Sequence, residues 1–167
     1  MRKTQHAELL EMVKTLQEAQ EQIKIYLEKK NVAMAQDLLA QCQDAIVSIG
    51  NTIEAFEGEG FITVEYAQEY CDTLYQIYEE LNQTPADTNP NKVGKVLKKL
   101  LLRVENSIKN DIHVKKEVVF FPYKTSMWDA LESVYLAAKA DPDCDAYCVP
   151  IPYYDRNPDR SLGQMHY

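Results

Sequence analysis

The sequence lacks an apolar run of roughly 18 residues, the length that a membrane-spanning helix needs. Its N-terminal stretch, MRKTQHAELLEM, has two basic residues and no apolar block behind them, so we expect no secretory signal. Cysteine is scarce, with four in the chain, and without a signal these predict reduced thiols in a cytoplasmic protein. Cys144 and Cys148 are the closest pair, and because no CxxC pair occurs we expect no metal site.

Basic residues are also in deficit, because 18 Lys and Arg face 26 Asp and Glu and the net charge is −8. This acidity argues against nucleic acid as a partner. The deficit is uneven: residues 1–91 hold 6 basic and 16 acidic side chains, whereas residues 92–116 hold 8 basic and 2 acidic ones. The basic segment therefore needs its own explanation.

Four side chains of the basic segment fall on one side of a predicted helix: Lys92, Lys95, Lys99 and Arg103. A basic amphipathic helix can rest on an anionic membrane surface or hold an acidic polymer. The alternative is a solvated face that balances the acidic helices before it, which is the more common role of a charge run.

The first two thirds of the chain have the periodicity of helices. Apolar residues recur at three- and four-residue steps over residues 4–30, 32–53, 63–82 and 90–110. Asn31, Thr63 and Asn89 are the expected N-caps, and a proline follows Asn89 at the first helical position. Because each helix has one apolar stripe and most loops are short, the pattern predicts an antiparallel four-helix bundle, or paired helical hairpins, over residues 1–112.

The pattern changes over residues 113–167. VVFF is a continuous apolar run typical of a strand that is covered on both faces. Ser126 is the expected N-cap of a helix that ends near Ala140, and AYCVPI is a second apolar strand. Two strands joined through one helix should be parallel, so the order predicts a βαβ unit, followed by a polar and aromatic loop. The fold class is therefore mainly α, with an incomplete Rossmann-like domain after the bundle.

Both predicted strand ends carry candidate binding residues. The first set is Tyr123, Lys124, Thr125 and Ser126. The N-terminus of a helix offers free N–H groups, and Lys124 adds a positive charge, so a phosphate can be held there. The set lacks the glycines of a dinucleotide-binding loop or a P-loop, and we expect no cofactor. The alternative is that Ser126 is only a cap and Lys124 is solvated.

The second set follows the second strand: Tyr153, Tyr154, Asp155, Arg156, Asn157 and His166. Aromatic rings with Asp and Arg can hold a polyol or a sugar phosphate, with Arg156 paired to the phosphate. His166 is a candidate acid or base, although no partner carboxylate can be assigned to it from the sequence. The alternative is a surface loop whose tyrosines pack on a further part of the domain.

Several strings of the sequence are similar to one known group. EGEGFITVEY, LLRVENSIKNDIHVKKEVVF, FPYKTSMWD and VPIPYYDRNPD together resemble bacterial proteins of the CDP-glycerol glycerophosphotransferase family. Some of these proteins have a helical N-terminal region ahead of two Rossmann-like domains of the GT-B type. The resemblance covers nearly the whole chain, and it implies that the chain is the helical region plus the start of the first Rossmann-like domain.

The same resemblance implies an activity for the longer protein, namely transfer of glycerol phosphate from CDP-glycerol to a teichoic-acid-type polymer. The partners would be a polyol-phosphate acceptor and a nucleotide-linked glycerol donor, with peripheral contact at the inner membrane face. The nucleotide would lie mainly on the second domain and the better-known catalytic histidines in later segments, so we do not expect these residues to catalyse transfer alone.

Two other functions are compatible with the residues. One is a non-catalytic helical module that binds a protein partner or an anionic membrane surface. The other is a small hydrolase that uses His166, although no nucleophile and base occur at motif spacing. Exposed edges of parallel strands would also favour an oligomer.

Overall fold

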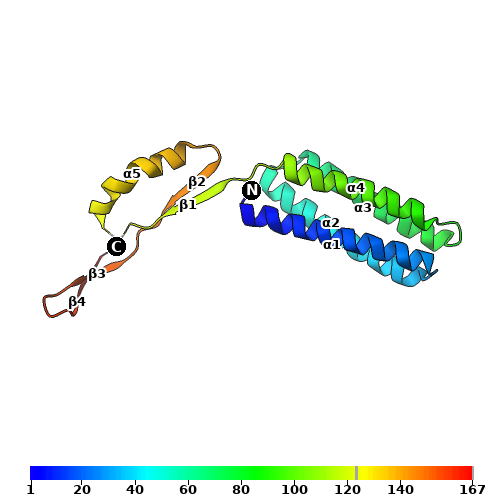
Figure 1. The fold of residues 1–167 in the computed structure, drawn as a ribbon, viewed down its shortest axis with the longest axis horizontal. Coiled ribbons are helices and arrows are strands. Elements are labelled where there is room, and N and C mark those ends of the chain that lie inside the picture. The colour runs from blue at the N-terminus through cyan, green and yellow to red at the C-terminus, as the bar shows by residue number, and fades with distance from the viewer. Residues whose placement is uncertain (123, 167) are drawn as a thin grey trace. The chain divides into compact units, whose positions relative to one another are not determined.

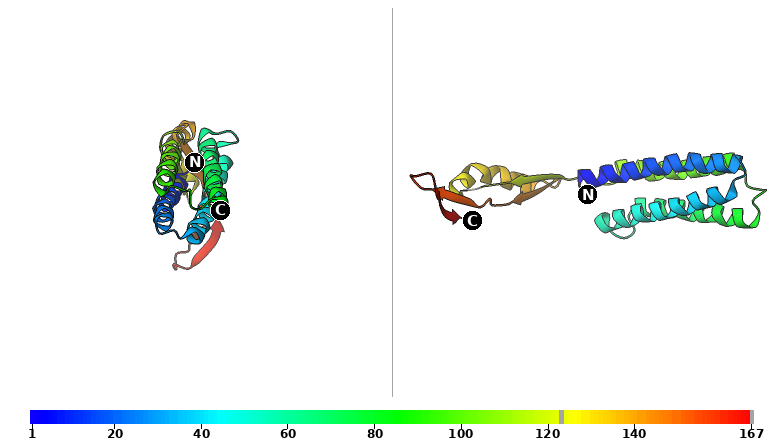
Figure 2. Two further views of the ribbon diagram at one scale, coloured as in Figure 1. Left: turned by 90° about the vertical axis from the view of Figure 1, so that its right-hand side faces the viewer. Right: turned by 90° about the horizontal axis from the view of Figure 1, so that it is seen from below.

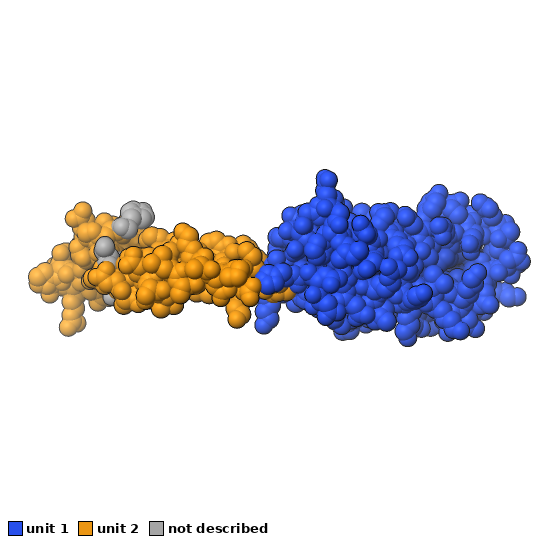
Figure 3. All heavy atoms as spheres, turned by 90° about the horizontal axis from the view of Figure 1, so that it is seen from above, with its two compact units in different colours: residues 1, 3–113 blue, residues 2, 114–167 orange. Residues whose placement is uncertain are grey.

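The computed structural model describes residues 1–122 and 124–166. It divides into two compact units, one of residues 1 and 3–113 and the other of residues 2 and 114–167 (Figure 3). Over the described residues the chain forms five helices and four strands. The fold is mainly helical, with a small parallel sheet after the first four helices.

The first unit contains four long helices (Figure 1): α1 (Lys3–Glu28), α2 (Val32–Glu57), α3 (Ile62–Gln83) and α4 (Pro90–Asn110). Each helix packs against the next one along the chain, and α1 also packs against α4. Figure 2 shows α1 beside α4 and α2 beside α3. The helices therefore form a closed bundle, as the single apolar stripe of each one predicts.

The core of the bundle is built from those stripes. In α4, for example, the buried side chains include Val93, Leu97, Leu100, Leu101, Val104 and Ile108. The side chain of Val96 is 37% exposed, because its position lies beyond the edge of the stripe. None of the described helices is long and apolar enough to cross a membrane.

Two of the three N-caps predicted for the bundle are confirmed. The side chain of Asn31 accepts a hydrogen bond from the backbone N–H of Met34, and Asn89 caps α4 with Pro90 at the next position. The prediction for Thr63 is wrong, because α3 begins at Ile62 and Thr63 is fully buried. Its hydroxyl instead lies 2.7 Å from the hydroxyl of Ser107 in α4.

The break between α2 and α3 lies at the EGEG string, Glu57–Gly60. The second helix continues to Glu57, four residues beyond the expected end at Ile53. Gly58 and Gly60 then have φ angles of 93° and 76°, in the left-handed region that favours glycine. The EGEG string therefore ends the helix through backbone conformation rather than through side-chain capping.

The second unit contains the predicted parallel pair of strands. Strand β1 (Lys116–Phe120) pairs with β2 (Cys144–Cys148), and α5 (Thr125–Ala140) connects them. Phe120 is buried, and its ring meets that of Tyr135 edge-on with centroids 5.6 Å apart. Helix α5 therefore covers one face of the sheet.

Ser126 is not the N-cap of α5, which corrects the sequence-based expectation. The helix begins at Thr125, and the carbonyl of Lys124 accepts the N–H of Met127. Lys124 therefore occupies the N-cap position, and its side chain makes no capping hydrogen bond. The first residue of α5 is therefore determined by where the chain leaves β1, and not by which residue has the best capping side chain.

The segment after β2 was expected to be a loop, but part of it forms a β-hairpin. Strand β3 (Tyr153–Arg156) pairs antiparallel with β4 (Leu162–His166). The turn is closed by two backbone hydrogen bonds between Asn157 and the residues Arg160 and Ser161. The hairpin gives the polar and aromatic side chains of this segment fixed positions.

Candidate functional site

The backbone after β2 stays next to the backbone after β1. The N–H of Val149 donates to the carbonyl of Phe120 at 2.9 Å, and the N–H of Ile151 donates to the carbonyl of Pro122 at 3.0 Å. These two bonds extend the parallel pairing past the ends of both strands. The start of β3 is thereby held close to the residues that open α5.

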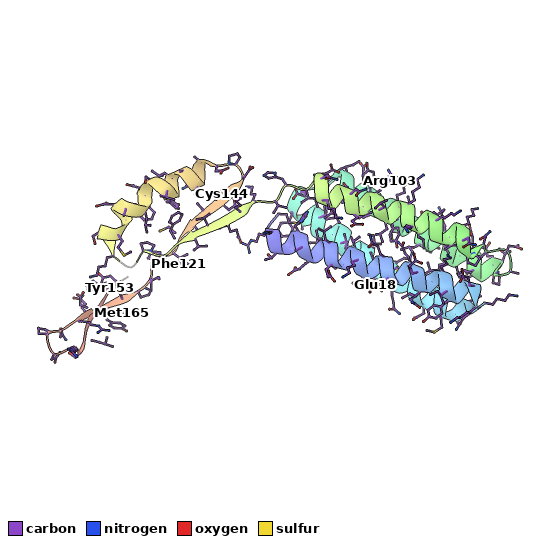
Figure 4. The ribbon with its side chains drawn as sticks, viewed as in Figure 1. Glu18, Arg103, Phe121, Cys144, Tyr153 and Met165 are labelled. Atoms are coloured by element: carbon purple, nitrogen blue, oxygen red, sulfur yellow. The ribbon has the colours of Figure 1, made fainter. Side chains whose placement is uncertain are left out.

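Four side chains meet at this edge, and we call them the strand-end cluster: Lys124, Tyr153, Asp155 and His166. The ammonium of Lys124 lies 5.5 Å from the ring centroid of Tyr153. The rings of Tyr153 and His166 are stacked, with centroids 5.0 Å apart and planes 20° apart. His166 Nε2 lies 2.7 Å from Asp155 Oδ2. Figure 4 labels Tyr153 on β3, next to Met165 on β4.

The register of the hairpin explains why these side chains meet. Tyr153 lies directly opposite His166, and side chains at such cross-strand positions are neighbours. Asp155 is two residues after Tyr153, where side chains return to the same face of a strand. A register irregularity between Tyr154 and Arg156 brings the chain close to Gly163. A Cβ on that glycine would lie 3.1 Å from the carbonyl oxygen of Asp155, so a side chain there would crowd the site.

The cluster combines a cation, two stacked rings and a carboxylate at the surface. The side chain of His166 is 35% exposed and that of Asp155 is 56% exposed. A ligand from solution can therefore reach them. Lysine attracts phosphate, and aromatic faces pack against the carbon atoms of a polyol, so the arrangement suits a small phosphorylated alcohol.

The remaining predicted residues of the two sets lie elsewhere or are not described. Tyr123 is outside the described residues. Ser126 is exposed in the first turn of α5, and Tyr154 is 49% exposed opposite Met165, on the other face of the strand from Tyr153. Arg156 is exposed and pairs in register with Leu162.

Reasoning from the sequence missed the partner of His166. Asp155 was named as a binding residue, but the two are eleven positions apart and no motif joins them. The available signal was the pair of short strands YYDR and LGQMH around the turn formers NPDRS. Treating that segment as a hairpin would have placed a carboxylate beside the imidazole.

The basic side chains of α4 do not form one uniform patch. Lys92, Lys95 and Lys99 are exposed. Arg103 donates a hydrogen bond of 2.7 Å to Glu69 of α3, and its guanidinium lies 4.4 Å from the ring centroid of Tyr66. The charge of Arg103 is therefore compensated within the bundle, whereas the three lysines face solvent.

A polar groove of about 200 Å³ lies between α1 and α4. Its lining includes Lys24, Lys95 and Lys98, and also Glu21. Lys24 is 3.8 Å from Glu28, which partly offsets its charge. The groove has more cations than anions, but no buried polar side chain is left without a partner there among the described residues.

Within the described part of the chain, no group of three or more His, Cys, Asp or Glu side chains is placed to hold a metal ion. The four cysteines are free thiols. Burial raises the pKa of Cys42 to about 11 and also raises that of Cys71. These two thiols are therefore protonated near neutral pH and belong to the packing of the bundle.

The chain matches no protein-family model, no curated protein and no solved structure. The strand-end cluster and the sequence itself are therefore the basis for the function proposed below.

Proposed function

We propose that this chain is the N-terminal portion of a glycerophosphotransferase-like protein and that its second unit begins a Rossmann-like domain of the GT-B type. In this proposal the strand-end cluster holds a polyol-phosphate ligand, and the chain does not catalyse transfer alone. One observation carries the proposal: Lys124 and Tyr153 follow different strands of a parallel pair and meet beyond its carboxyl end. Ligands of open α/β domains bind at that end of the sheet.

The uncovered surface of the second unit supports an incomplete Rossmann-like domain. Val119 and Tyr147 are paired in register and are 42% and 43% exposed, although α5 covers Phe120. Parallel sheets normally have both faces covered by helices. Val134 of α5 is also 56% exposed. Further strands and helices would cover these apolar side chains.

Two members of the cluster bind the ligand in this proposal: Lys124 pairs with the phosphate, and Tyr153 supports the carbon chain of the polyol. Arg156 lies outside the cluster and offers a second cation on the same hairpin as Tyr153. The nucleotide of a donor such as CDP-glycerol would bind mainly outside this chain, and the longer protein would work in the cytoplasm, at the inner membrane face.

Calorimetry with glycerol 3-phosphate tests the proposal. We expect Lys124→Met to weaken binding by about tenfold, which is about 1.4 kcal/mol, because a charge-assisted hydrogen bond is lost. Lys139→Met is the matched control, because Lys139 also lies over a ring, at 5.7 Å from the centroid of Tyr135, but on α5. Equal binding by the wild type and the Lys124 variant would contradict the proposal. Much tighter binding of CDP-glycerol than of glycerol 3-phosphate would place the nucleotide site in this chain.

A second candidate function is a helical module that contacts an anionic membrane surface. It rests on the exposure of Lys92, Lys95 and Lys99 along α4. Reversing these three charges to Glu should abolish sedimentation with phosphatidylserine vesicles, since each lysine near such a surface contributes about 1 kcal/mol. The control reverses Lys14, Lys29 and Lys30, which changes the net charge equally. Loss of binding in both triple variants would indicate attraction by overall charge and count against a defined face.

A further inference from the structure

The polar groove between α1 and α4 belongs to the first unit, where Figure 2 shows these two helices side by side. Three lysines line it: Lys24 of α1, and Lys95 and Lys98 of α4. Among the described residues of its lining, Glu21 has the only carboxylate. The groove has a volume of about 200 Å³, below the roughly 300–1,000 Å³ of a site for a drug-sized molecule, so its size suits a small anion.

The positive charge of the groove is poorly compensated within the bundle. Lys95 and Lys98 are exposed, and in the part of the chain that the structure describes neither forms an ion pair with a carboxylate. Lys24 lies 3.8 Å from Glu28, but both side chains are partly exposed, and such a surface pair contributes little. The groove therefore has an excess of positive charge that a ligand from solution can neutralise.

The place of these lysines along α4 is unfavourable for the helix itself. The helix dipole favours anions near the N-terminus and cations near the C-terminus. The first turn of α4 has no acidic residue, Lys92 lies in that turn and Lys95 in the next. Lys95 and Lys98 are also three positions apart, where side chains of like charge are neighbours. Asn91, in the first turn, lines the groove, so a bound anion would lie near the end of α4 that favours it.

Gly94 makes room for one of the lysines. It lies inside α4, and its φ is not positive, so any residue can adopt its backbone conformation. Glycine inside a helix is destabilising relative to alanine, because it loses more backbone freedom on folding. A Cβ at this position would lie 3.3 Å from Cδ of Lys24, which is closer than an ordinary contact. The glycine therefore lets the side chain of Lys24 lie against α4, in the same groove as Lys95.

We propose that the groove between α1 and α4 binds a small multivalent phosphate, of which diphosphate is the simplest. Three features that each weaken the bundle meet there: a glycine inside a helix, lysines near a helix start, and like charges at neighbouring positions. Such departures from local preference are typical of functional sites. Several lysines around one space favour an anion with more than one negative charge, and their ammonium groups pair with its oxygens. The strand-end cluster lies in the other unit, so this proposal does not depend on the proposed function.

NMR titration of the whole chain with sodium diphosphate tests the proposal, with sodium chloride at equal ionic strength as the reference. We expect diphosphate alone to shift the amide signals of Asn91, Gly94 and Lys95. Lys98→Gln should weaken binding by about fivefold, the upper range for one exposed ion pair. Lys99→Gln is the matched control, because Lys99 is the next residue of α4, is exposed and does not line the groove. This control should change the affinity by about twofold or less, since salt screens a more distant charge.

Gly94→Ala separates binding from folding. The added methyl group displaces the side chain of Lys24, so diphosphate should bind about fivefold more weakly. Without ligand, the urea midpoint of this variant should equal or exceed that of the wild type, because alanine favours the helix. Unchanged affinity in Gly94→Ala would overturn the role of Gly94 and Lys24. Equal losses in Lys98→Gln and Lys99→Gln would overturn the groove as the site, because they would indicate attraction by the overall charge of α4. Shifts no larger with diphosphate than with chloride would overturn the whole proposal.

Discussion

The buried hydrogen bond between Gln20 and Tyr70 allows a quantitative prediction for the bundle. Tyr70 is fully buried and Gln20 is 5% exposed. The amide Nε2 of Gln20 donates to the Tyr70 hydroxyl at 2.6 Å and to the carbonyl of Leu97 at 3.3 Å. Burial raises the pKa of Tyr70 well above its ordinary value, so the hydroxyl is neutral at working pH. The pair thus links α1, α3 and α4 through uncharged groups.

Tyr70→Phe removes the nearer acceptor and leaves Gln20 with only its longer bond. The free energy of unfolding should fall by about 1–2 kcal/mol, the usual cost of an unsatisfied buried polar group. Gln20→Leu should cost a similar amount, because the Tyr70 hydroxyl loses its donor. The double variant should lie within about 0.5 kcal/mol of the wild type, because removing both partners leaves no buried polar group unpaired.

Urea unfolding followed by far-ultraviolet circular dichroism measures all three variants. With a slope of about 2 kcal/mol per molar urea, the single variants should shift the midpoint by about 0.5–1 M. The coupling energy from the double-mutant cycle should have the sign of a favourable interaction. Additive losses in the double variant would refute the reasoning, because the two side chains would then not act as a pair.

Three further predictions concern other parts of the chain. Because burial raises the pKa of Cys42 to about 11, a maleimide at pH 8 should label the exposed Cys148 before Cys42. Mass spectrometry measures the two labelling rates, and equal rates would contradict the burial of Cys42. The hydrogen bond from Lys109 lowers the pKa of Glu105, so Glu105 stabilises the fold above its unfolded pKa and loses this effect as pH falls through its folded pKa. In Glu105→Gln the free energy of unfolding should therefore fall less steeply as the pH is lowered. Urea unfolding at a series of acidic pH values measures this, and an equal fall in the variant and the wild type would count against the prediction. Phe120→Ala should lower the free energy of unfolding of the second unit by about 3 kcal/mol and collapse the NMR dispersion of that unit alone. A lower melting temperature of the bundle would contradict this prediction.

The helices could be predicted because their determinants are local. In α4 the apolar side chains recur at helical spacing, and Asn89 and Pro90 mark its start in the sequence. The parallel strands were also predictable, since both are short apolar runs around one helix. Thr63 shows the limit of such reasoning: its sequence context suits a cap, but the approach of α4 buries its hydroxyl against Ser107.

The candidate site could be predicted only as two separate sets of residues. Lys124 and Tyr153 were predicted because each follows a strand. Their contact, however, depends on the backbone hydrogen bonds that hold together the segments after β1 and β2. The pairing of Asp155 with His166 depends on the register of a hairpin that the periodicity did not reveal. Strands of four and five residues carry too little periodic signal for their pairing to be inferred.

The sequence by itself therefore determined which segments are helices, which faces are apolar and where charge of each sign is concentrated. These properties follow from side-chain type and spacing along one segment. Only the tertiary structure decided which side chains meet, whether Gln20 with Tyr70 in the core or His166 with Asp155 at the surface. The reason is physical: a contact between distant segments depends on the path and the register of both segments. The side-chain pattern within one segment encodes neither the path nor the register of the other.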